Sequence, residues 1–374
     1  MPDNDAVVPS GAQTGAFDAH RAGVLFFSRG RGHAHAVPDM AIVDELARLR
    51  DDFELRFVSY GAGALALAAH QRPLIDLDMP DANPLWTTVL RAGQLIRQMQ
   101  PNLVVSHEEF AVLPVAKIFG LPAIFITEWF SDPDHLAMQS LAYADEVIVI
   151  EESGIFDEPP CVEGKVSYVG PVLRSFSYSK ADRNRARGEL GFDQEATIIL
   201  VMPGGWATEE REPIYDTVMP VFDALKIPRK LLVWIAGADY ELLTRRLAKR
   251  ADVIVKERDW QIDRLMVASD LAITKGKRGT LRELYSLGIP SISISHGLNP
   301  FDDVLIERFH TNTALDARTL THKMLATSIL EALRDGVGTR ASKERSSAQP
   351  NSNGAVLAAQ RLADAIAALG RNSG

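Results

Sequence analysis

Short runs of aliphatic and β-branched residues alternate along the chain with longer segments whose apolar positions recur at helical spacing. Residues 23–30 (GVLFFSRG) form the first apolar run, and residues 36–50 (AVPDMAIVDELARLR) follow with a helical period. The alternation continues through FELRFVSYG, AGALALAAH, NLVVSH, VLPVAKIFG, PAIFITEWF and DEVIVI. Strands that alternate with amphipathic helices form right-handed βαβ units, so the pattern predicts an α/β fold with parallel sheets.

The alternation of strands and helices is interrupted at residues 158–185, where prolines, glycines and polar residues gather. It resumes with ATIILVMPGG. We therefore expect two Rossmann-like, doubly wound domains facing a central cleft, at residues 23–170 and 171–335. Outside them we expect a disordered leader (1–22), a polar linker (336–353) and a last amphipathic helix (354–374) packing back on the body.

Composition narrows the class of protein. The 374 residues suit two cores, and 46% hydrophobic with 24% charged residues is typical of globular domains. A net charge of -9 argues against a nucleic-acid partner. The single cysteine, Cys161, excludes internal disulfides and fits a reducing cytoplasm. Neither a transmembrane segment nor a signal peptide is expected, and peripheral contact with the inner membrane face stays open.

The loop after the first strand, from Ser28 to Pro38, is a candidate site. Gly30 and Gly32 allow a ligand to approach the backbone, with Arg29 and Arg31 beside them. His33 lies near the turn into the next helix, where a neutral imidazole could accept a hydroxyl proton. It could equally cap the helix, or ligate a metal together with His35.

The loop after the second strand carries Gly61, Gly63 and Ala66, a G-x-G-x-x-A pattern, with Asp76 and Asp78 further on. This is a weak dinucleotide fingerprint, because it follows the second strand and its helix is short. A tight βα turn is the favoured alternative. The pairs Asp76/Asp78 and Asp132/Asp134 are weak candidates for a divalent metal.

Two loops of the second half suit a phosphate. Gly204 and Gly205 follow a buried strand, and residues 274–280 (TKGKRGT) combine glycines with three cations: Lys275, Lys277 and Arg278. Gly276 and Gly279 would let this loop curl and Thr280 would cap its helix, which matches a diphosphate. A plain turn and a solvated basic loop are the alternatives. Glu283 is either a first-turn acid or a ribose ligand.

A last polar cluster follows the strand SISI. His296, Asn299, Asp302 and Asp303 could hydrogen-bond a sugar, or could form a turn and a helix cap.

In this order, the loops resemble those of the family 28 GT-B glycosyltransferases, the MurG-like group. SRGRGHAHAVPDMAIVDEL is similar to that family's first glycine loop, YVGPVLR to the segment leading into its second domain, and VMPGGWATE to its G-G-S-x-G loop. ASDLAITKGKRGTLRELYSLGIPSISI is similar to its nucleotide-sugar segment. The resemblance covers about residues 23–335.

The resemblance implies roles for individual residues. His33 falls at the acceptor-side histidine, Gly204 and Gly205 at the phosphate loop, and Glu283 at the ribose-binding acid. Gly279 and Thr280 lie beside the diphosphate, Arg258 to Gln261 (with Trp260) at the base, and Asp302 and Asp303 at the donor sugar. Trp206, the basic KGKRG and HGLNPFDD depart from the family pattern, which leaves the donor sugar open.

The implied activity is inverting transfer of a sugar from a nucleotide diphosphate sugar, preferably a UDP-sugar, to an acceptor hydroxyl of unknown identity. The acceptor could be a small molecule, a glycan or a lipid-linked molecule. His33 is the first choice of base, with Glu108 and Glu109 second. Amides and cations would stabilise the leaving diphosphate without a metal or other cofactor. The alternatives are a nucleotide-sugar hydrolase or epimerase, a non-catalytic binding subunit of a transferase complex and, last, a nucleotide-dependent oxidoreductase.

Overall fold

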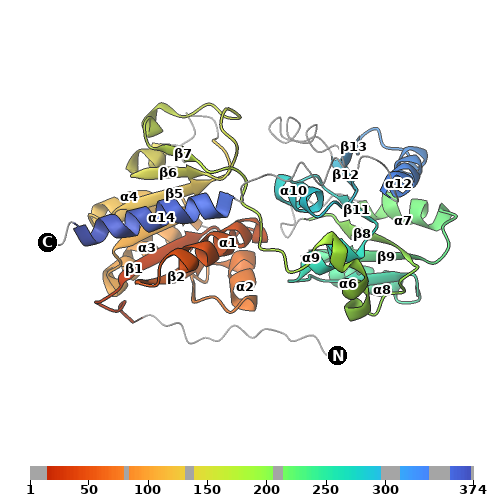
Figure 1. Ribbon diagram of the computed structural model, residues 1–374, viewed down its shortest axis with the longest axis horizontal. Helices are drawn as coiled ribbons and strands as arrows, with labels where there is room; N and C mark the ends of the chain where they lie inside the picture. The colour runs from red at the N-terminus through yellow and green to blue at the C-terminus, as the bar shows by residue number, and fades with distance from the viewer. Residues whose placement is uncertain are drawn as a thin grey trace. The chain divides into compact units, whose positions relative to one another are not determined.

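The computed structural model describes residues 15–79, 84–130, 139–204, 214–295, 312–336 and 354–371 (Figure 1). The chain divides into two compact units. The first takes in the described residues up to Arg174 together with the last helix, and the second begins at Ser175. The expected leader and linker lie largely outside the described residues.

A seven-stranded sheet forms the centre of the first unit, in the order β3-β2-β1-β4-β5-β6-β7. Its strands are β1 (Ala22–Ser28), β2 (Phe53–Ser59), β3 (Leu74–Asp76), β4 (Leu103–His107), β5 (Ala123–Thr127), β6 (Glu146–Val149) and β7 (Val166–Tyr168). Every pairing between them is parallel. Helices cover both faces of such a sheet, which is why β1, β4 and β5 are almost wholly buried apolar runs.

The helices of this unit form two groups. The helices α1 (His33–Leu49) and α2 (Gly61–Ala69) pack together, as do α3 (Pro84–Met99) and α4 (Val112–Ile118). The C-terminal helix α14 (Gly354–Arg371) lies along α1, and Arg50 donates a hydrogen bond to the carbonyl of Ala363 (Figure 1). Short 3-10 turns occupy Ser140–Tyr143 and Pro160–Val162.

The second unit contains a six-stranded sheet in the order β10-β9-β8-β11-β12-β13. Its strands are β8 (Thr197–Met202), β9 (Lys230–Ile235), β10 (Val253–Lys256), β11 (Leu271–Thr274), β12 (Ser291–Ser295) and β13 (Asn312–Asp316), again all parallel. Both sheets are therefore doubly wound, and the predicted fold of two Rossmann-like domains is confirmed.

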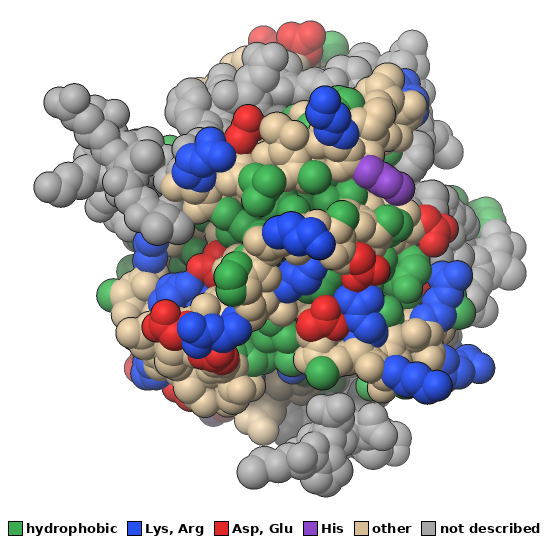
Figure 2. All heavy atoms as spheres, turned by 90° about the vertical axis from the view of Figure 1, so that its right-hand side faces the viewer, with side chains coloured by type: hydrophobic (Ala, Val, Ile, Leu, Met, Phe, Trp, Pro, Cys, Tyr) green, Lys and Arg blue, Asp and Glu red, His purple; other side chains and the backbone are tan. Residues whose placement is uncertain are grey.

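Two apolar cores flank the second sheet. One is shared by α7 (Ile214–Ala224), α8 (Tyr240–Leu247) and α12 (His322–Gly336). The other is shared by α6 (Arg183–Leu190), α9 (Ile262–Ala268) and α10 (Arg278–Ser286). Short turns at Lys180–Asp182 and Gly237–Asp239 lead into α6 and α8. Figure 2 shows acidic and basic side chains interspersed on one face of the molecule. In the second unit, Arg250 forms ion pairs with Asp223 and Asp252.

Candidate functional site

Each sheet has one point where the strand order reverses, between β1 and β4 in the first unit and between β8 and β11 in the second. Loops at the carboxyl ends of the strands beside such a point form the ligand site of open α/β sheets. In the first unit these loops begin at Arg29 and Glu108. In the second they contain Gly204 and residues 275–277. The sequence-predicted residues on these loops therefore gather at the two expected positions.

The loops after β1 and β2 pack directly on each other. A Cβ added to Gly30 would lie 2.0 Å from the Tyr60 carbonyl oxygen, and one on Gly63 would lie 3.0 Å from the Gly30 Cα. The Gly63 amide donates to the Gly30 carbonyl at 3.3 Å. The glycines of the dinucleotide-like pattern thus serve close packing between two βα loops, which supports the interpretation as a tight turn.

The first turn of α1 follows this packed loop. His33 is its first residue and is partly exposed, while Gly32 precedes the helix in an extended conformation without a side-chain cap. A Cβ on Gly32 would meet nothing within 4 Å, and Arg31 is exposed. The backbone amides at this helix end therefore lie in open surroundings suited to an anion.

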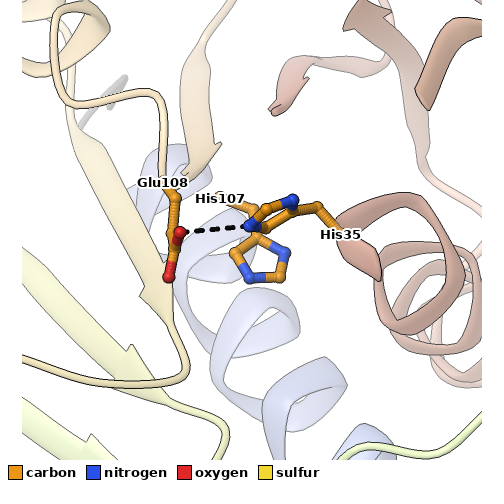
Figure 3. Close-up of side chains that lie close together, drawn as sticks. All are labelled: His35, His107 and Glu108. Carbon is orange, nitrogen blue, oxygen red and sulfur yellow. Dashed lines mark hydrogen bonds and ion pairs between the residues drawn. The ribbon is translucent and has the colours of Figure 1, made fainter. Parts of the chain in front are cut away.

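Glu108, directly after β4, is the centre of a polar cluster (Figure 3). Its Oε2 accepts hydrogen bonds from Arg29 Nη1 and His35 Nε2, both at 3.1 Å, and its Oε1 accepts one from Thr127 at 3.2 Å. The Glu108 side chain is only 5% exposed and that of His35 is 17% exposed. Three strand ends and one helix thus converge on a single carboxylate.

The backbone and the charge of Glu108 are both unusual. Its φ of +56° lies in the left-handed region, which costs a non-glycine residue roughly 1–2 kcal/mol. Burial alone would raise the pKa of this carboxyl. The His35 hydrogen bond and the neighbouring cations outweigh burial and hold the pKa well below its usual value. Glu108 is therefore a permanent anion, so it is a poor base and suits a positioning role.

A second carboxylate–histidine pair lies behind the first. His107 Nδ1 and Asp39 Oδ1 are 2.6 Å apart, and both side chains are fully buried. Burial lowers the pKa of His107, but the charge and hydrogen bond of Asp39 more than offset this, so the pKa is raised. The His107 ring meets that of His35 edge-on, with centroids 4.8 Å apart.

Glu109, the other acid predicted on this loop, lies in a different setting. It accepts a 2.7 Å hydrogen bond from the Tyr60 hydroxyl, and burial raises the pKa of its carboxyl. Burial and the charge of Glu109 likewise raise the pKa of Tyr60. The pKa values of the two adjacent glutamates are therefore shifted in opposite directions, because cationic partners outweigh burial only at Glu108.

Three potential metal-ligand atoms of this cluster, from His35, His107 and Glu108, lie within 4.8 Å of one another. The Arg29 guanidinium, however, already contacts Oε2 of the Glu108 carboxylate. His107 is also held by Asp39 in a state that favours its proton. A metal centre needs neutral imidazoles and an accessible carboxylate, so the arrangement fits an ion-pair network better.

In the second unit, the loop after β11 has some, but not all, of the features predicted for a diphosphate site. Gly276 has φ +84°, its amide donates to Thr274 Oγ1 at 2.9 Å, and the exposed Lys277 precedes α10 without a side-chain cap. The expectation that Thr280 caps the helix and that Gly279 curls the loop is wrong. The helix begins at Arg278, because the turn is completed at Gly276, and both residues lie in its first turn.

The remaining donor-side residues are spread over neighbouring strand ends. Gly204 (φ +69°) lies just after β8, whose Met202 pairs in register with Thr274 of β11. Glu283 is buried on α10. Arg258 contacts Glu257 and lies over the Trp260 ring in the loop between β10 and α9. Gly205, His296, Asp302 and Asp303 lie outside the described residues.

Sequence reasoning missed the roles of His35, Asp39, His107 and Tyr60. One signal was available, because His35 and Asp39 stand four residues apart on the helix face that continues with the buried Ile42 and Leu46. Two polar residues at positions of a core-facing stripe indicate a buried partner. The partner itself, 68 residues away from Asp39, left no local pattern.

Known glycosyltransferases are similar in sequence to most of the chain. It is 24% identical over 263 residues to an uncharacterised glycosyltransferase of Methanopyrus kandleri, covering 64% of this chain and 71% of that protein. It is 26% identical over 342 residues to the UDP-N-acetylglucosamine–N-acetylmuramyl-(pentapeptide) pyrophosphoryl-undecaprenol N-acetylglucosamine transferase of Desulforudis audaxviator, covering 84% and 87%. No family model matches the chain.

Solved structures agree with these relatives. The MurG of Acinetobacter baumannii superposes with a TM-score of 0.61 at 15% identity, covering 93% of this chain and 99% of the other. The chain has the GT-B fold and is similar to MurG-type glycosyltransferases. The glycotransferase of kitacinnamycin superposes on this GT-B chain with a TM-score of 0.65 at 16% identity, covering 93% and 99%. A putative UDP-N-acetylglucosamine 2-epimerase of Listeria monocytogenes does so with 0.64 at 16%, covering 93% and 96%.

Proposed function

We propose that the chain transfers a sugar from a UDP-sugar to an acceptor hydroxyl, with inversion at the anomeric carbon. The observation that carries this is the second unit's switch point, where Gly204, Gly276 and the uncapped start of α10 follow adjacent strands. Backbone amides and helix N-termini stabilise a diphosphate, and Lys275, Lys277 and Arg278 supply positive charge there. The MurG-type relatives support the activity class.

The first experiment is calorimetric titration with UDP, GDP, dTDP and NAD, followed by a UDP-sugar panel. Selective UDP binding is expected, and Glu283→Ala should weaken it about tenfold or more if Glu283 holds the ribose hydroxyls. Glu241→Ala is the matched control, because Glu241 is an exposed acid of the same unit. Binding of NAD alone, or an unchanged donor Kd in Glu283→Ala, would contradict the assignment.

The epimerase likeness makes a nucleotide-sugar epimerase or hydrolase the second candidate. Both would act on the same donor in the absence of any acceptor. Chromatography of the UDP-sugar after incubation with protein alone distinguishes them. A new stereoisomer or steady release of sugar favours the alternative, while donor consumption only with acceptor supports transfer. Tight binding without turnover indicates a non-catalytic subunit.

We also propose that transfer needs no bound metal or cofactor. Amide groups and cations of the second unit supply the charge that a metal would otherwise bring to the leaving diphosphate. Turnover should then be the same after dialysis against EDTA as with added Mg²⁺ or Mn²⁺. Loss of turnover in EDTA that the metal restores would refute this.

A lipid-linked acceptor at a membrane surface is the partner we favour. Among the described helices, none is long and apolar enough to cross a bilayer. The helices α3 and α4 nevertheless expose large apolar side chains, with Trp86 63% and Ile118 81% exposed; the others are Leu85, Leu90 and, directly after α4, Phe119. Arg91 and Arg97 lie on the exposed side of the same helix α3. Co-sedimentation with anionic vesicles, lost in Trp86→Ser, would support peripheral binding.

A further inference from the structure

A hydrogen bond between Tyr60 and Glu109 joins the two loops on either side of the glycine loop after β1. In the first sheet, β1 lies between β2 and β4. Tyr60 directly follows β2, and Glu109 lies just beyond the end of β4. Because neighbouring strands are about 4.8 Å apart, side chains that start from β2 and β4 must together span roughly 10 Å to meet. Tyr60 and Glu109 do meet, at 2.7 Å.

Both members of this pair are held in place. A Cβ added to Gly30 would lie 2.7 Å from Tyr60 Cδ2, so the tyrosine ring fills the space beside Gly30 that the sequence offered to a ligand. The Glu109 carbonyl accepts hydrogen bonds from the Ser106 hydroxyl at 2.9 Å and the Val112 amide at 3.0 Å. The pair is therefore a fixed part of the surface at the carboxyl ends of these strands.

Glu109 has an oxygen available to a ligand, whereas both oxygens of Glu108 are occupied. Glu108 is 5% exposed, and its two oxygens accept hydrogen bonds from three side chains. Glu109 is partly exposed, and the Tyr60 hydroxyl donates only to its Oε1. Among the described residues, none donates a hydrogen bond to Glu109 Oε2. That oxygen can accept a hydrogen bond from a bound molecule.

The charges around Glu109 narrow the kind of group that it would bind. Arg29, His35 and Arg31 all act on the charge of its carboxyl. A ligand cation placed on Glu109 would be repelled by the two guanidinium groups, and a ligand anion would be repelled by the carboxylate itself. A neutral hydroxyl group donates to Oε2 without either penalty.

We propose, on the basis of the function proposed above, that Tyr60 and Glu109 select the acceptor. The donor diphosphate is assigned to the second unit, which leaves these loops of the first unit for the acceptor. Glu109 Oε2 accepts a hydrogen bond from an acceptor hydroxyl that does not react, and Tyr60 orients the carboxylate by holding its other oxygen. The pair thereby favours an acceptor with several hydroxyls over one that carries only the reacting hydroxyl.

The test compares octyl glycosides of several sugars with 1-octanol, using one UDP-sugar as donor. These acceptors share an apolar tail and differ in their hydroxyls. The wild-type protein should use the best glycoside at least about tenfold more efficiently than 1-octanol, as judged by kcat/KM. Glu109→Ala should lower kcat/KM for that glycoside about 10- to 100-fold, mainly through KM, and should change it less than about twofold for 1-octanol. A merely structural role would lower both.

Tyr60→Phe supplies a second readout, because it removes only the hydroxyl that orients Glu109. It should raise KM for the glycoside about three- to tenfold and leave kcat and the Kd for UDP within about twofold. Combined with Glu109→Ala, it should add no further loss, because Tyr60 acts through Glu109. Glu163→Ala is the matched control and should change none of these quantities, since Glu163 is an exposed acid of the same unit.

The outcomes separate this proposal from the function on which it rests. If the protein does not bind UDP selectively, the proposed function fails and the acceptor assignment fails with it. If UDP binds but the glycosides are no better acceptors than 1-octanol, or Glu109→Ala lowers kcat/KM equally for both, the pair does not select the acceptor. Additive losses in the double variant overturn the positioning role of Tyr60.

Discussion

At the residue scale, the ion pair between Asp39 and His107 is costly in free energy. Both side chains are fully buried, and Asp39 Oδ2 and His107 Nε2 have no hydrogen-bond partner among the described residues. Two charges are removed from water here with incomplete compensation, which rarely favours stability. The pair is best explained by what it orients, the His35 ring in contact with it.

We expect Asp39→Asn to destabilise the first unit by about 3–5 kcal/mol, because it leaves a buried imidazolium without its counter-charge. Asp39→Asn combined with His107→Asn should cost less than the sum of the single changes. The folded pKa of His107 is raised, so the pair's contribution is complete below the ordinary histidine pKa and is lost as the pH rises through the folded value.

Denaturant unfolding at several pH values, monitored by hydrogen exchange of the β4 amides, measures the loss of stability in each variant and its dependence on pH. The destabilisation by Asp39→Asn should shrink as the pH increases. Additive losses in the double variant, or a loss that grows with pH, would show that the two side chains are not an ion pair.

At the element scale, contact between two loops places residues of the candidate site. The β1 and β2 loops touch through Gly30 and Gly63, and this contact fixes where Arg29 and the start of α1 emerge. Alternation of apolar strands and amphipathic helices predicted these elements well, because strands buried on both faces read as continuous apolar runs. The start of α10 was misplaced, because glycine inside a first turn looks like a loop residue.

Gly30→Ala should destabilise the protein by about 1–3 kcal/mol or more, because its Cβ would sit 2.0 Å from the Tyr60 carbonyl oxygen and the backbone must move. Gly32→Ala is the matched change in the same loop. Its φ of -171° suits any residue and its Cβ meets open space, so the cost should stay within about 0.5 kcal/mol. Thermal melts of the two variants decide the point, and equal losses would argue against the observed loop packing.

At the scale of the whole molecule, the chain's last helix belongs to the first unit. Helix α14 buries Ala355, Ala358, Leu362 and Ile366 in the first unit, where it lies along α1, the helix that carries His33, His35 and Asp39. In contrast to these residues, Leu357 of α14 is 47% exposed. The end of the sequence therefore supports the helix on which the candidate base stands.

Leu362→Ala should cost the first unit about 2–4 kcal/mol, the usual loss for a buried leucine, whereas Leu357→Ala should cost less than about 0.5 kcal/mol. UDP binding by the second unit should be unchanged in both. Unfolding monitored by hydrogen exchange in α1, with calorimetric UDP titration in parallel, tests this. Equal stability of the two variants would mean that α14 does not pack as described.

The sequence by itself determined the class of fold, the two doubly wound sheets and the loops at which ligands would bind. These follow from hydrophobic period and turn chemistry, which are local properties. It also supported the family, through the order of its glycine loops.

Only the tertiary structure showed that His35 meets the Glu108 carboxylate. His33 and His35 stand two residues apart, and Glu108 and Glu109 are neighbours. The strand order brings Glu108 beside Arg29 and His35, and sends Glu109 to Tyr60. Such pairings join residues 49 to 79 positions apart, and they depend on side-chain direction at strand ends, which leaves no periodic trace in the sequence.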